Sequence, residues 1–284
     1  IFNINLFIYF MMLDQKLLLR EQISIGFIGC GVVGNAISNF YQKTGKYNII
    51  KYDKYKKIGV FNDILNCELL FLCLPTPFNS ETNNSDTTEI LNVCEQLNNH
   101  KYDGYILVKS TVIPESTKSL NNIFENIKII HNPEFLSQKT ADSDFENQNQ
   151  IILGGDSKYT SIIKQFYHID FPSVKISEMS SEESEMVKFA LNNFYAVKIQ
   201  YFTELYLLCK DRNIDYNVVK DSMLLNNWIN PMHTQVPGHD GKVSYGGMCF
   251  PKDTNAFLTY MKEHSKYYAV LNATIKERDE LRND

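Results

Sequence analysis

The sequence predicts an α/β fold in which a parallel sheet covered by helices is followed by a second, all-helical domain. Short apolar runs alternate with amphipathic segments through the first part of the chain, as in a sheet with a helix after each strand. This alternation stops near Ser180, where a long helical pattern begins. A chain of 284 residues that is 44% hydrophobic and 21% charged can form two domains with buried cores.

The first domain is predicted from six apolar runs, each bounded by turn residues, that suit buried strands. They cover residues 23–28, 47–52, 69–74, 105–109, 127–131 and 151–153. Helical spacing of apolar residues lies between them, over 32–44, 87–97 and from about residue 114. Glycine readily takes the left-handed conformation that ends many helices, so Gly45 is expected to end the first of these. We assign this domain to residues 21–178.

The helical domain is assigned to residues 179–284. The acidic stretch from Ser181 to Glu185 suits a helix N-terminus, because the helix dipole favours negative charge there. This helix is expected to run to about Cys209, and another helix is expected after Pro251, beyond a loop rich in glycine and proline. The length and apolar content of the first helix also indicate a subunit interface, so we expect a homodimer.

The first twenty residues are expected to lie outside the fold. The chain begins at Ile1, and residues 1–12 are apolar, without a basic region or a cleavage site. They are too few to span a bilayer, which takes about 20 residues. We interpret them as upstream sequence ahead of a start at Met11 or Met12, with a weak membrane anchor as the alternative.

Composition excludes several classes of partner. The net charge is −5 with no basic stripe, so no nucleic-acid partner is expected. The six cysteines form no CxxC pair and no zinc-like spacing with histidine, which predicts no metal site and a reducing compartment. We therefore expect a cytoplasmic protein without a membrane partner.

Three glycines after the first expected strand form a dinucleotide-binding fingerprint. Gly29, Gly31 and Gly34 open the following helix, with Cys30, Val32 and Val33 between them. The first glycine makes the turn, the second lets the backbone approach a pyrophosphate, and the third permits close packing of helix on strand. Asp53 ends the next strand, 19 residues after Gly34, where an acid accepts hydrogen bonds from a ribose diol. The pattern predicts a Rossmann-type domain that binds NAD, and three lysines leave NADP as the alternative: Lys54, Lys56 and Lys57.

A second group of chemically informative residues lies far downstream, over residues 244–253. Glycines precede Cys249 and leave room for a ligand, and Pro251 suits the first turn of a helix. Cys249 is therefore expected at a helix N-terminus, where the dipole favours the thiolate and Lys252 adds positive charge. A thiolate beside a nicotinamide suits covalent oxidation of an aldehyde. An inert cysteine buried in a tight loop is the alternative.

Several motifs, in order along the chain, resemble those of the UDP-glucose/GDP-mannose dehydrogenase family, from about Ser24 to the C-terminus. Besides the glycine loop and the cysteine segment, they are Leu74-Pro75-Thr76-Pro77, Ser110-Thr111-Val112, Asn132-Pro133-Glu134-Phe135-Leu136, and Lys188 with Asn192. The resemblance implies further NAD contacts from Pro75, Thr76, Pro77, Ser110, Thr111 and Lys252. It also implies a nucleotide-sugar substrate, UDP-glucose above others, contacted by Glu134, Phe135, Leu136, Gln138, Lys188, Asn192, His233, Tyr245 and Gly246.

The chemistry that this resemblance implies is a double oxidation of the sugar's primary alcohol to a carboxylate, using two NAD in turn. Cys249 is then the group that captures the intermediate aldehyde as a thiohemiacetal, which a second hydride transfer converts to a thioester. Lys188 and Asn192 lie four residues apart, so on a helix both can face one oxygen and stabilise an oxyanion. The resemblance implies that Asp253 works with an ordered water, as a base or as a group that positions the base. It implies that Glu134 is the acid that assists thioester hydrolysis and that the Thr111 hydroxyl helps hold that water.

Three departures from the family pattern affect the substrate side. The family's usual glutamate, four residues after Glu134, is Gln138 here, and an amide cannot act as a base. Its substrate-binding arginine, sixteen residues before the cysteine, is His233, whose charge depends on pH. Full-length members continue into another Rossmann-like domain that helps bind the nucleotide, whereas this sequence stops at Asp284. We therefore expect a short form or a fragment that lacks the third domain.

Two other functions fit parts of the sequence. A hydroxyacid dehydrogenase shares the Rossmann-plus-helical organisation and a lysine–asparagine pair, but it has no use for the segment around Cys249. A non-catalytic remnant that binds NAD and assembles with a longer homologue fits the missing third domain.

Overall fold

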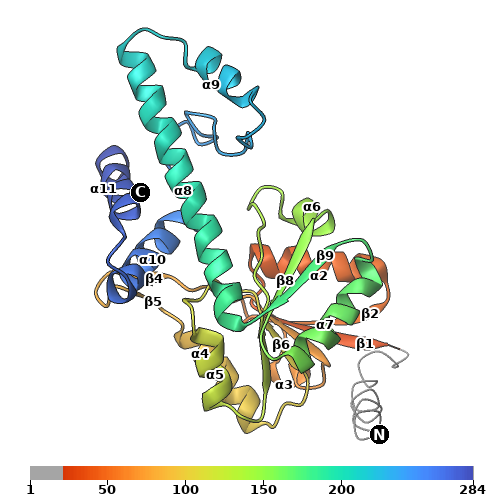
Figure 1. Ribbon diagram of the computed structural model, residues 1–284. Helices are drawn as coiled ribbons and strands as arrows, with labels where there is room; N and C mark the ends of the chain where they lie inside the picture. Colours follow the sequence, from red (N-terminus) through yellow and green to blue (C-terminus); the bar gives the residue numbers. More distant parts are fainter. Residues whose placement is uncertain (1–21, 284) are drawn as a thin grey trace, which may run out of the picture. The chain divides into compact units, whose positions relative to one another are not determined.

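The computed structural model describes residues 22–283, so the expectations for residues 1–20 lie outside the described part of the chain. The chain forms two compact units, which Figure 1 shows by element. Among the described residues, the first contains 22–76 together with 86–186, and the second contains 77–85 and 187–283. The predicted boundary between the domains lies between residues 178 and 179. In the structure the first turn of the long helix packs in the first unit, and residues 77–85 pack in the second.

One seven-stranded sheet organises the first unit, in the order β2-β1-β3-β6-β7-β8-β9. The strands are β1 (Ile23–Ile28), β2 (Tyr47–Tyr52), β3 (Leu69–Leu72), β6 (Tyr105–Val108), β7 (Lys128–His131), β8 (Gln150–Gly154) and β9 (Lys175–Met179). Neighbouring strands run parallel, except β7 and β8, which pair antiparallel through His131 and Gly154. The predicted sheet is therefore confirmed as mostly parallel, with one reversed pair that the sequence pattern did not indicate.

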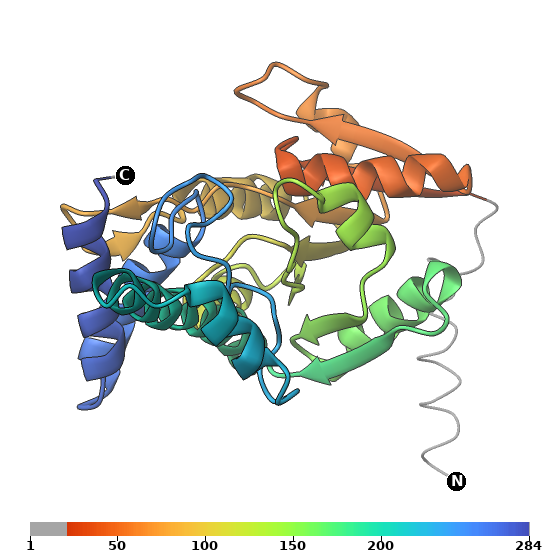
Figure 2. The ribbon, with the colours of Figure 1, turned by 90° about the horizontal axis from the view of Figure 1, so that it is seen from above.

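Helices cover both faces of this sheet, as predicted (Figure 2). One face packs against α2 (Val32–Thr44), α6 (Ala141–Glu146) and α7 (Ser157–Asp170) through side chains such as Phe27, Phe71 and Phe166. The other face packs against α3 (Phe61–Ile64), α4 (Thr88–Asn99) and α5 (Ser116–Ile123) through side chains such as Leu70 and Ile106. Side chains that alternate along each strand reach opposite faces, so both faces of a central strand must be apolar.

The strand ends at one edge of the sheet determine where a ligand can bind. Ile28, Leu72 and Val108 lie side by side in the parallel register, so β1, β3 and β6 end together. The chain passes from β1 to β2 on one side and reaches β3 on the other, which makes this edge a topological switch point. Open α/β sheets bind their ligands at such a point, outside the carboxyl ends of the strands.

The second unit is mainly helical, as predicted. Its helices are α8 (Ser181–Asp211, which begins in the first unit), α9 (Tyr216–Leu224), α10 (Phe250–His264) and α11 (Ala269–Leu281). A two-stranded hairpin, β4 (Phe78–Asn79) with β5 (Asn84–Ser85), packs on α10. Phe202 and Tyr216 belong to an apolar cluster between α8 and α9, and Leu258 and Ile275 to one between α10 and α11. Among the described residues, no helix is both long and apolar enough to cross a bilayer.

Candidate functional site

The glycine turn after β1 has the tight geometry that the sequence predicted. Gly29 has a φ of +96°, and a Cβ there would lie 2.5 Å from the carbonyl oxygen of Cys73. A Cβ on Gly34 would lie 2.0 Å from the carbonyl oxygen of Gly29. Both positions therefore require glycine because neighbouring backbone fills the space that a side chain needs.

Gly31 differs, because a Cβ there would meet no atom within 4 Å. The residue is the N-cap of α2, whose first amides, those of Val32 and Val33 among them, have no carbonyl acceptor within the helix. Open space in front of unpaired amides and the positive end of a helix dipole fits a pyrophosphate. The residues of this turn therefore fit the diphosphate of a dinucleotide.

Asp53 lies next to this turn and is held by backbone amides. Its carboxylate accepts hydrogen bonds from the amides of Cys30 (2.9 Å), Tyr55 (3.1 Å) and Lys56 (2.9 Å). Partial burial acts to raise the pKa of Asp53, but these hydrogen bonds and the Lys56 charge outweigh it, so the pKa is lowered. Lys56 also donates from Nζ to the carbonyl oxygen of Cys30 at 2.6 Å. A carboxylate fixed in its charged form beside the turn suits a ribose diol and disfavours a 2′-phosphate.

The loops after β3 and β6 are joined by side-chain hydrogen bonds at the same edge. Ser110 Oγ donates to the carbonyl oxygen of Leu74 at 2.7 Å and accepts from the Leu74 amide at 3.1 Å. Thr76 Oγ1 donates to the carbonyl oxygen of Thr111 at 2.7 Å. Pro75 and Pro77 are exposed in this part of the chain, and Pro77 belongs to the second unit. Strand β3 ends at Leu72, two residues before its predicted end, because the Leu74 amide donates its hydrogen bond to Ser110 Oγ and not to a neighbouring strand.

Glu134 follows β7 and caps its own turn. Its Oε2 accepts a hydrogen bond from the Leu136 amide at 2.6 Å, and neighbouring Asn132 is fully buried, donating from Nδ2 to the Ile152 carbonyl oxygen at 2.8 Å. Phe135 and Leu136 are half-buried, and Gln138 is exposed. Glu134 and Thr111 thus lie in loops at the ends of β7 and β6, in the first unit.

Cys249 lies at the N-terminus of a helix, as predicted. It is the N-cap residue of α10, Pro251 occupies the first turn, and the thiol-bearing residue is exposed. The other cysteines are buried or half-buried, and burial raises the pKa of Cys67, Cys73 and Cys94 to about 12. Burial, followed by the charge of Asp53, also raises the pKa of Cys30. Cys249 is therefore the cysteine whose surroundings suit reaction with a ligand, and the alternative of a buried residue is wrong.

Asn192 and Lys252 hold the carboxylate of Asp253 from two sides. Asn192 Nδ2 donates to Oδ2 at 2.6 Å, and Lys252 Nζ lies 2.6 Å from Oδ1. Asp253 and Asn192 are buried, and Lys188 is buried one turn before Asn192 on α8. Asp253 also lies one turn after Cys249, because its amide donates to the Cys249 carbonyl oxygen at 3.0 Å. The second unit therefore brings together the predicted amide, the carboxylate and the helix that carries the thiol.

His233 is half-buried among aromatic rings. Its ring centroid lies 4.9 Å from that of Tyr195 on α8 and 5.6 Å from that of Phe250, the residue after Cys249. Burial, followed by the charge of Lys198, lowers the pKa of His233. At neutral pH this residue therefore offers a substrate a neutral ring, not the positive charge of the arginine that it replaces.

Of the residues just before Cys249, Gly247 leaves the open space that the sequence predicts, whereas Gly246 and Tyr245 pack against arginine side chains. A Cβ on Gly246 would lie 2.3 Å from Nη2 of Arg282, so this glycine makes room for a guanidinium group. Gly247, with a φ of +79° and no atom within 4 Å of its Cβ position, is the open one. The Tyr245 side chain is buried, with its ring 5.9 Å from the Arg278 guanidinium. Sequence reasoning missed both arginines, whose signal is only a spacing of four residues near the end of α11.

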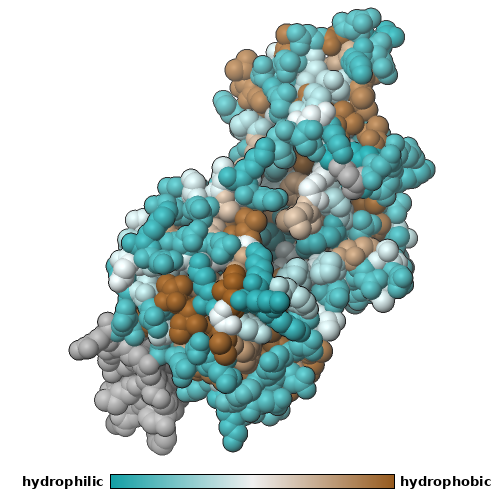
Figure 3. Space-filling view, turned by 180° about the vertical axis from the view of Figure 1, so that it is seen from behind, coloured by the Kyte–Doolittle hydropathy of each residue, from teal (hydrophilic) through white to brown (hydrophobic). Residues whose placement is uncertain are grey.

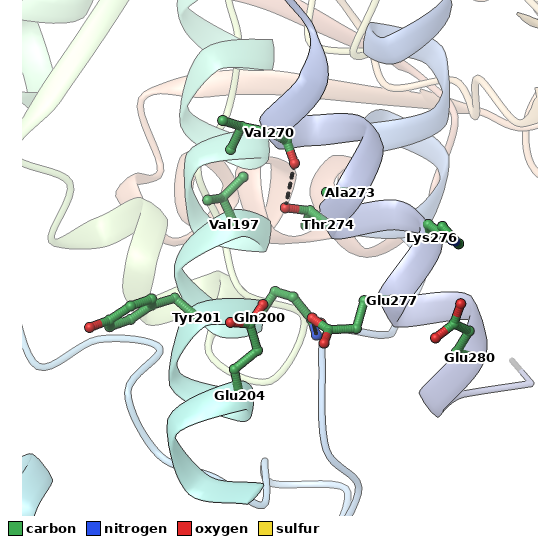
Figure 4. Close-up of a pocket in the computed structure, with 10 residues that line it drawn as sticks. All are labelled: Val197, Gln200, Tyr201, Glu204, Val270, Ala273, Thr274, Lys276, Glu277 and Glu280. Atoms are coloured by element: carbon green, nitrogen blue, oxygen red, sulfur yellow. Dashed lines mark hydrogen bonds between the residues drawn. The ribbon is translucent and has the colours of Figure 1, made fainter. Parts of the chain in front are cut away.

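A groove of about 460 Å³ lies between α8 and α11, apart from all of the predicted site residues. Figure 4 shows the ten residues that line it, which are Val197, Gln200, Tyr201, Glu204, Val270, Ala273, Thr274, Lys276, Glu277 and Glu280. Gln200 links this groove to the loop that precedes Cys249. Its Nε2 donates a hydrogen bond to Glu277, and its Oε1 accepts one from Ser244 Oγ.

These features define the class of protein. A glycine turn, an adjacent aspartate and a helix N-terminus at the switch point of a parallel sheet are those of a dinucleotide-dependent dehydrogenase. An exposed cysteine at the start of a helix adds a nucleophile that such a domain does not itself require.

Comparison with known proteins identifies the family. Residues 56–171 match the NAD-binding domain of the UDP-glucose/GDP-mannose dehydrogenase family, and residues 182–279 match its central domain. The chain belongs to this family, and its cofactor is NAD. The first match begins after the glycine turn and Asp53. The expectation that these residues bind the dinucleotide therefore depends on their own geometry.

Individual relatives agree with this assignment. The chain is 25% identical over 223 residues to a UDP-glucose 6-dehydrogenase of Bacillus subtilis, covering 76% of this chain and 47% of that protein. It thus spans about half the length of the curated relatives it matches. Its fold is similar to that of a UDP-glucose dehydrogenase from Pyrobaculum islandicum, with a TM-score of 0.79, 21% identity and coverage of 91% of this chain and 68% of that one. It is also similar to that of a Mycobacterium tuberculosis 3-hydroxyisobutyrate dehydrogenase, with a TM-score of 0.69, 14% identity and coverage of 91% and 93%.

Proposed function

We propose that this protein oxidises the primary alcohol of a nucleotide sugar to a carboxylate, with UDP-glucose as the preferred substrate and UDP-glucuronate as the product. The activity is that of a UDP-glucose 6-dehydrogenase. The observation that carries the proposal is the exposed Cys249 at the start of α10, one turn before a carboxylate held by Asn192 and Lys252. The NAD-binding and central domains of the family support it.

The first half of the proposed reaction makes an aldehyde. The glycine turn and Asp53 would hold NAD, which would supply the hydride acceptor for the alcohol carbon. The hydroxyl proton would pass to the water that Asp253 orders. Asn192 and the buried Lys188 are proposed to stabilise the negative charge that develops on this oxygen. Asp253 accepts a hydrogen bond at each carboxylate oxygen, so its side chain is held in place. A carboxylate held in this way suits the proposed role of ordering a water molecule.

Cys249 acts in the second half. Its thiolate adds to the aldehyde carbon, a C–S bond forms, and the oxygen takes a proton to give a thiohemiacetal. A second NAD at the same site would supply the acceptor for a second hydride, and the thiohemiacetal hydroxyl would give its proton to the water that Asp253 orders, which leaves a thioester. Water then adds to the thioester carbonyl, the C–S bond breaks, and the thiolate departs from the carboxylate product. Glu134 is proposed to assist this hydrolysis, and Thr111 to hold the water.

A hydroxyacid dehydrogenase is the second candidate, favoured by the fold similarity to a 3-hydroxyisobutyrate dehydrogenase. Such an enzyme makes one hydride transfer and leaves no role for Cys249. An NADH-release assay with UDP-glucose, GDP-mannose, N-acetylated sugar nucleotides and 3-hydroxyisobutyrate separates the candidates. Release with UDP-glucose that requires Cys249 supports the proposal, and release with the hydroxy acid alone supports the second candidate. Binding of NAD without any turnover contradicts both and identifies an NAD-binding remnant.

A homodimer is proposed as the assembly. Phe194, Tyr201 and Leu208 follow one another at seven-residue intervals on α8 and are 61%, 56% and 58% exposed. Seven residues are close to two turns of helix, so these side chains form an apolar stripe that a second copy can cover. Figure 3 shows apolar side chains that reach the surface in separate groups on one face of the molecule. Sedimentation of wild type and Tyr201→Lys tests this, and a monomeric wild type would contradict it.

The proposed location is the cytoplasm. The six cysteines all lie in the described part of the chain and form no disulfide there, which suits a reducing compartment. Cell fractionation with an antibody to the protein tests this, and recovery in a membrane or secreted fraction would contradict it.

A further inference from the structure

The backbone that leads to Cys249 is held by two arginines at the end of α11. Arg282 Nη1 donates to the carbonyl oxygens of Val243 (3.3 Å) and Ser244 (3.1 Å), and Arg278 Nε lies 3.4 Å from that of Tyr245. Three consecutive carbonyl groups in a segment without helix or strand are thus bound by guanidinium groups. Arg282 Nη2 also pairs with Asp240 Oδ2 at 2.7 Å, which fixes the start of the same loop.

Helix α8 holds this loop from another side. The Ser244 amide donates to Thr203 Oγ1 at 3.0 Å, and Ser244 Oγ donates to Gln200 Oε1 at 2.5 Å. Ser244 has a φ of +60°, a left-handed conformation that is unfavourable for a residue other than glycine. The hydrogen bonds from both helices keep the loop in this conformation.

The two guanidinium groups that bind these carbonyl oxygens are buried. Arg278 and Arg282 are only 8% and 6% exposed, and burying a charge is costly unless hydrogen-bond partners compensate for it. A guanidinium group has a rigid fork of donors, which can bind several carbonyl oxygens at once and hold a loop that has no hydrogen-bond ladder of its own.

The held loop ends close to Cys249. Only Gly246, Gly247 and Met248 separate it from the thiol-bearing residue, and Gly247 has a φ of +79° and open space around it. After Cys249 the chain continues directly into α10. Asn192 holds this helix by donating a hydrogen bond to Asp253, and Tyr245 Oη lies 3.5 Å from Thr254 Oγ1. Two glycines in succession restrict the backbone little, and Arg282, packed against Gly246, holds the chain at this point.

We propose that Arg282, assisted by Arg278, is a positioning residue that keeps Cys249 at the N-cap of α10, where the helix dipole favours its thiolate. The inference rests on the proposed function in taking Cys249 as the nucleophile. It requires no substrate or cofactor, so it can be tested separately from turnover.

The test is the rate at which iodoacetamide alkylates Cys249, located by peptide mass mapping, between pH 6 and pH 9.5. Arg282→Lys keeps the positive charge beside Asp240 but loses the fork. We expect the midpoint of its alkylation profile to rise by about half a pH unit, the size of a helix-dipole effect on a terminal charge. Arg282→Ala should show the same change, and guanidinium at millimolar concentration should restore the wild-type profile where sodium chloride at the same ionic strength does not.

Arg212→Lys, an exposed arginine at the end of α8, is the matched control and should keep the wild-type profile. Circular dichroism establishes that each variant is folded, and Arg278→Lys replaces any Arg282 variant that is not. Wild-type profiles in folded Arg282→Lys and Arg278→Lys would overturn the proposal, and so would restoration by sodium chloride. A shifted profile in a protein that shows no turnover would leave this inference standing and contradict only the proposed function.

Discussion

Glu185 is a buried carboxyl group whose replacement should change how stability depends on pH. It lies in the first turns of α8, is 0% exposed, and its Oε1 accepts a hydrogen bond from the Thr117 amide of α5 at 2.8 Å. Burial raises its pKa to about 7, against hydrogen bonds from Thr117 and the backbone of Glu115 that act to lower it. The folded protein therefore binds this proton more tightly than the unfolded chain does.

The direction and size of the effect follow from linkage. The ordinary pKa of the group is 4.5, so wild-type stability is highest below that pH and falls as pH rises towards 7. A rise of about 2.5 pKa units corresponds to about 3 kcal/mol lost above pH 7. Glu185→Gln cannot ionise and keeps an oxygen for the Thr117 amide. Its free energy of unfolding relative to wild type should therefore increase by about 3 kcal/mol between pH 4 and pH 8.

Urea denaturation followed by circular dichroism at pH 4, 5, 6, 7 and 8 measures this difference. The two proteins can be compared where their m-values are equal.

Glu183→Gln is a control whose effect on stability should depend on pH in the opposite direction. Hydrogen bonds from Ser180 lower the pKa of Glu183, so its contribution to stability is present at neutral pH and is lost as pH falls. That variant should be less stable than wild type at pH 7, with the difference vanishing in acid. A difference between Glu185→Gln and wild type that stays constant with pH would refute the reasoning about Glu185.

Three further predictions concern the residues of the expected NAD site. Gly31→Ala should leave thermal stability nearly unchanged, since a Cβ there meets no atom, but weaken NAD binding at least about tenfold in calorimetry because it enters the phosphate space. Gly34→Ala should instead lower stability by about 2 kcal/mol or more, since its Cβ would lie 2.0 Å from the Gly29 oxygen; equal melting temperatures for the two variants would contradict this contrast. Asp53→Ser should reduce the preference for NAD over NADP in paired titrations, because it removes the carboxylate beside the turn, and an unchanged preference would argue for another determinant.

Features set by nearby residues were predicted well from the sequence. The turn at Gly29, the helix from Val32 to Thr44 and its end at Gly45 all lie within one short stretch, where spacing and glycine geometry decide the conformation. The same holds for Cys249, because Pro251 shortly after it marks the start of a helix. The N-termini of α2 and α10 therefore lie where the sequence predicts them.

Features that depend on distant contacts could not be predicted. The antiparallel pairing of β8 with β7 depends on strand order, which no local pattern contains. Gly246 was interpreted as space for a ligand, whereas Arg282, 36 residues later, occupies that space. His233 likewise takes its aromatic neighbours from α8 and α10, so its lowered pKa follows from tertiary packing.

The central claim is that Cys249 carries an oxidation of a sugar alcohol through to the acid. The most direct measurement is the number of NADH released for each UDP-glucuronate formed from UDP-glucose, for wild type and Cys249→Ser. We predict two NADH per acid for wild type and no acid from the folded Cys249→Ser variant. One NADH with an aldehyde product, acid formation without Cys249, or NAD binding without turnover would contradict the account.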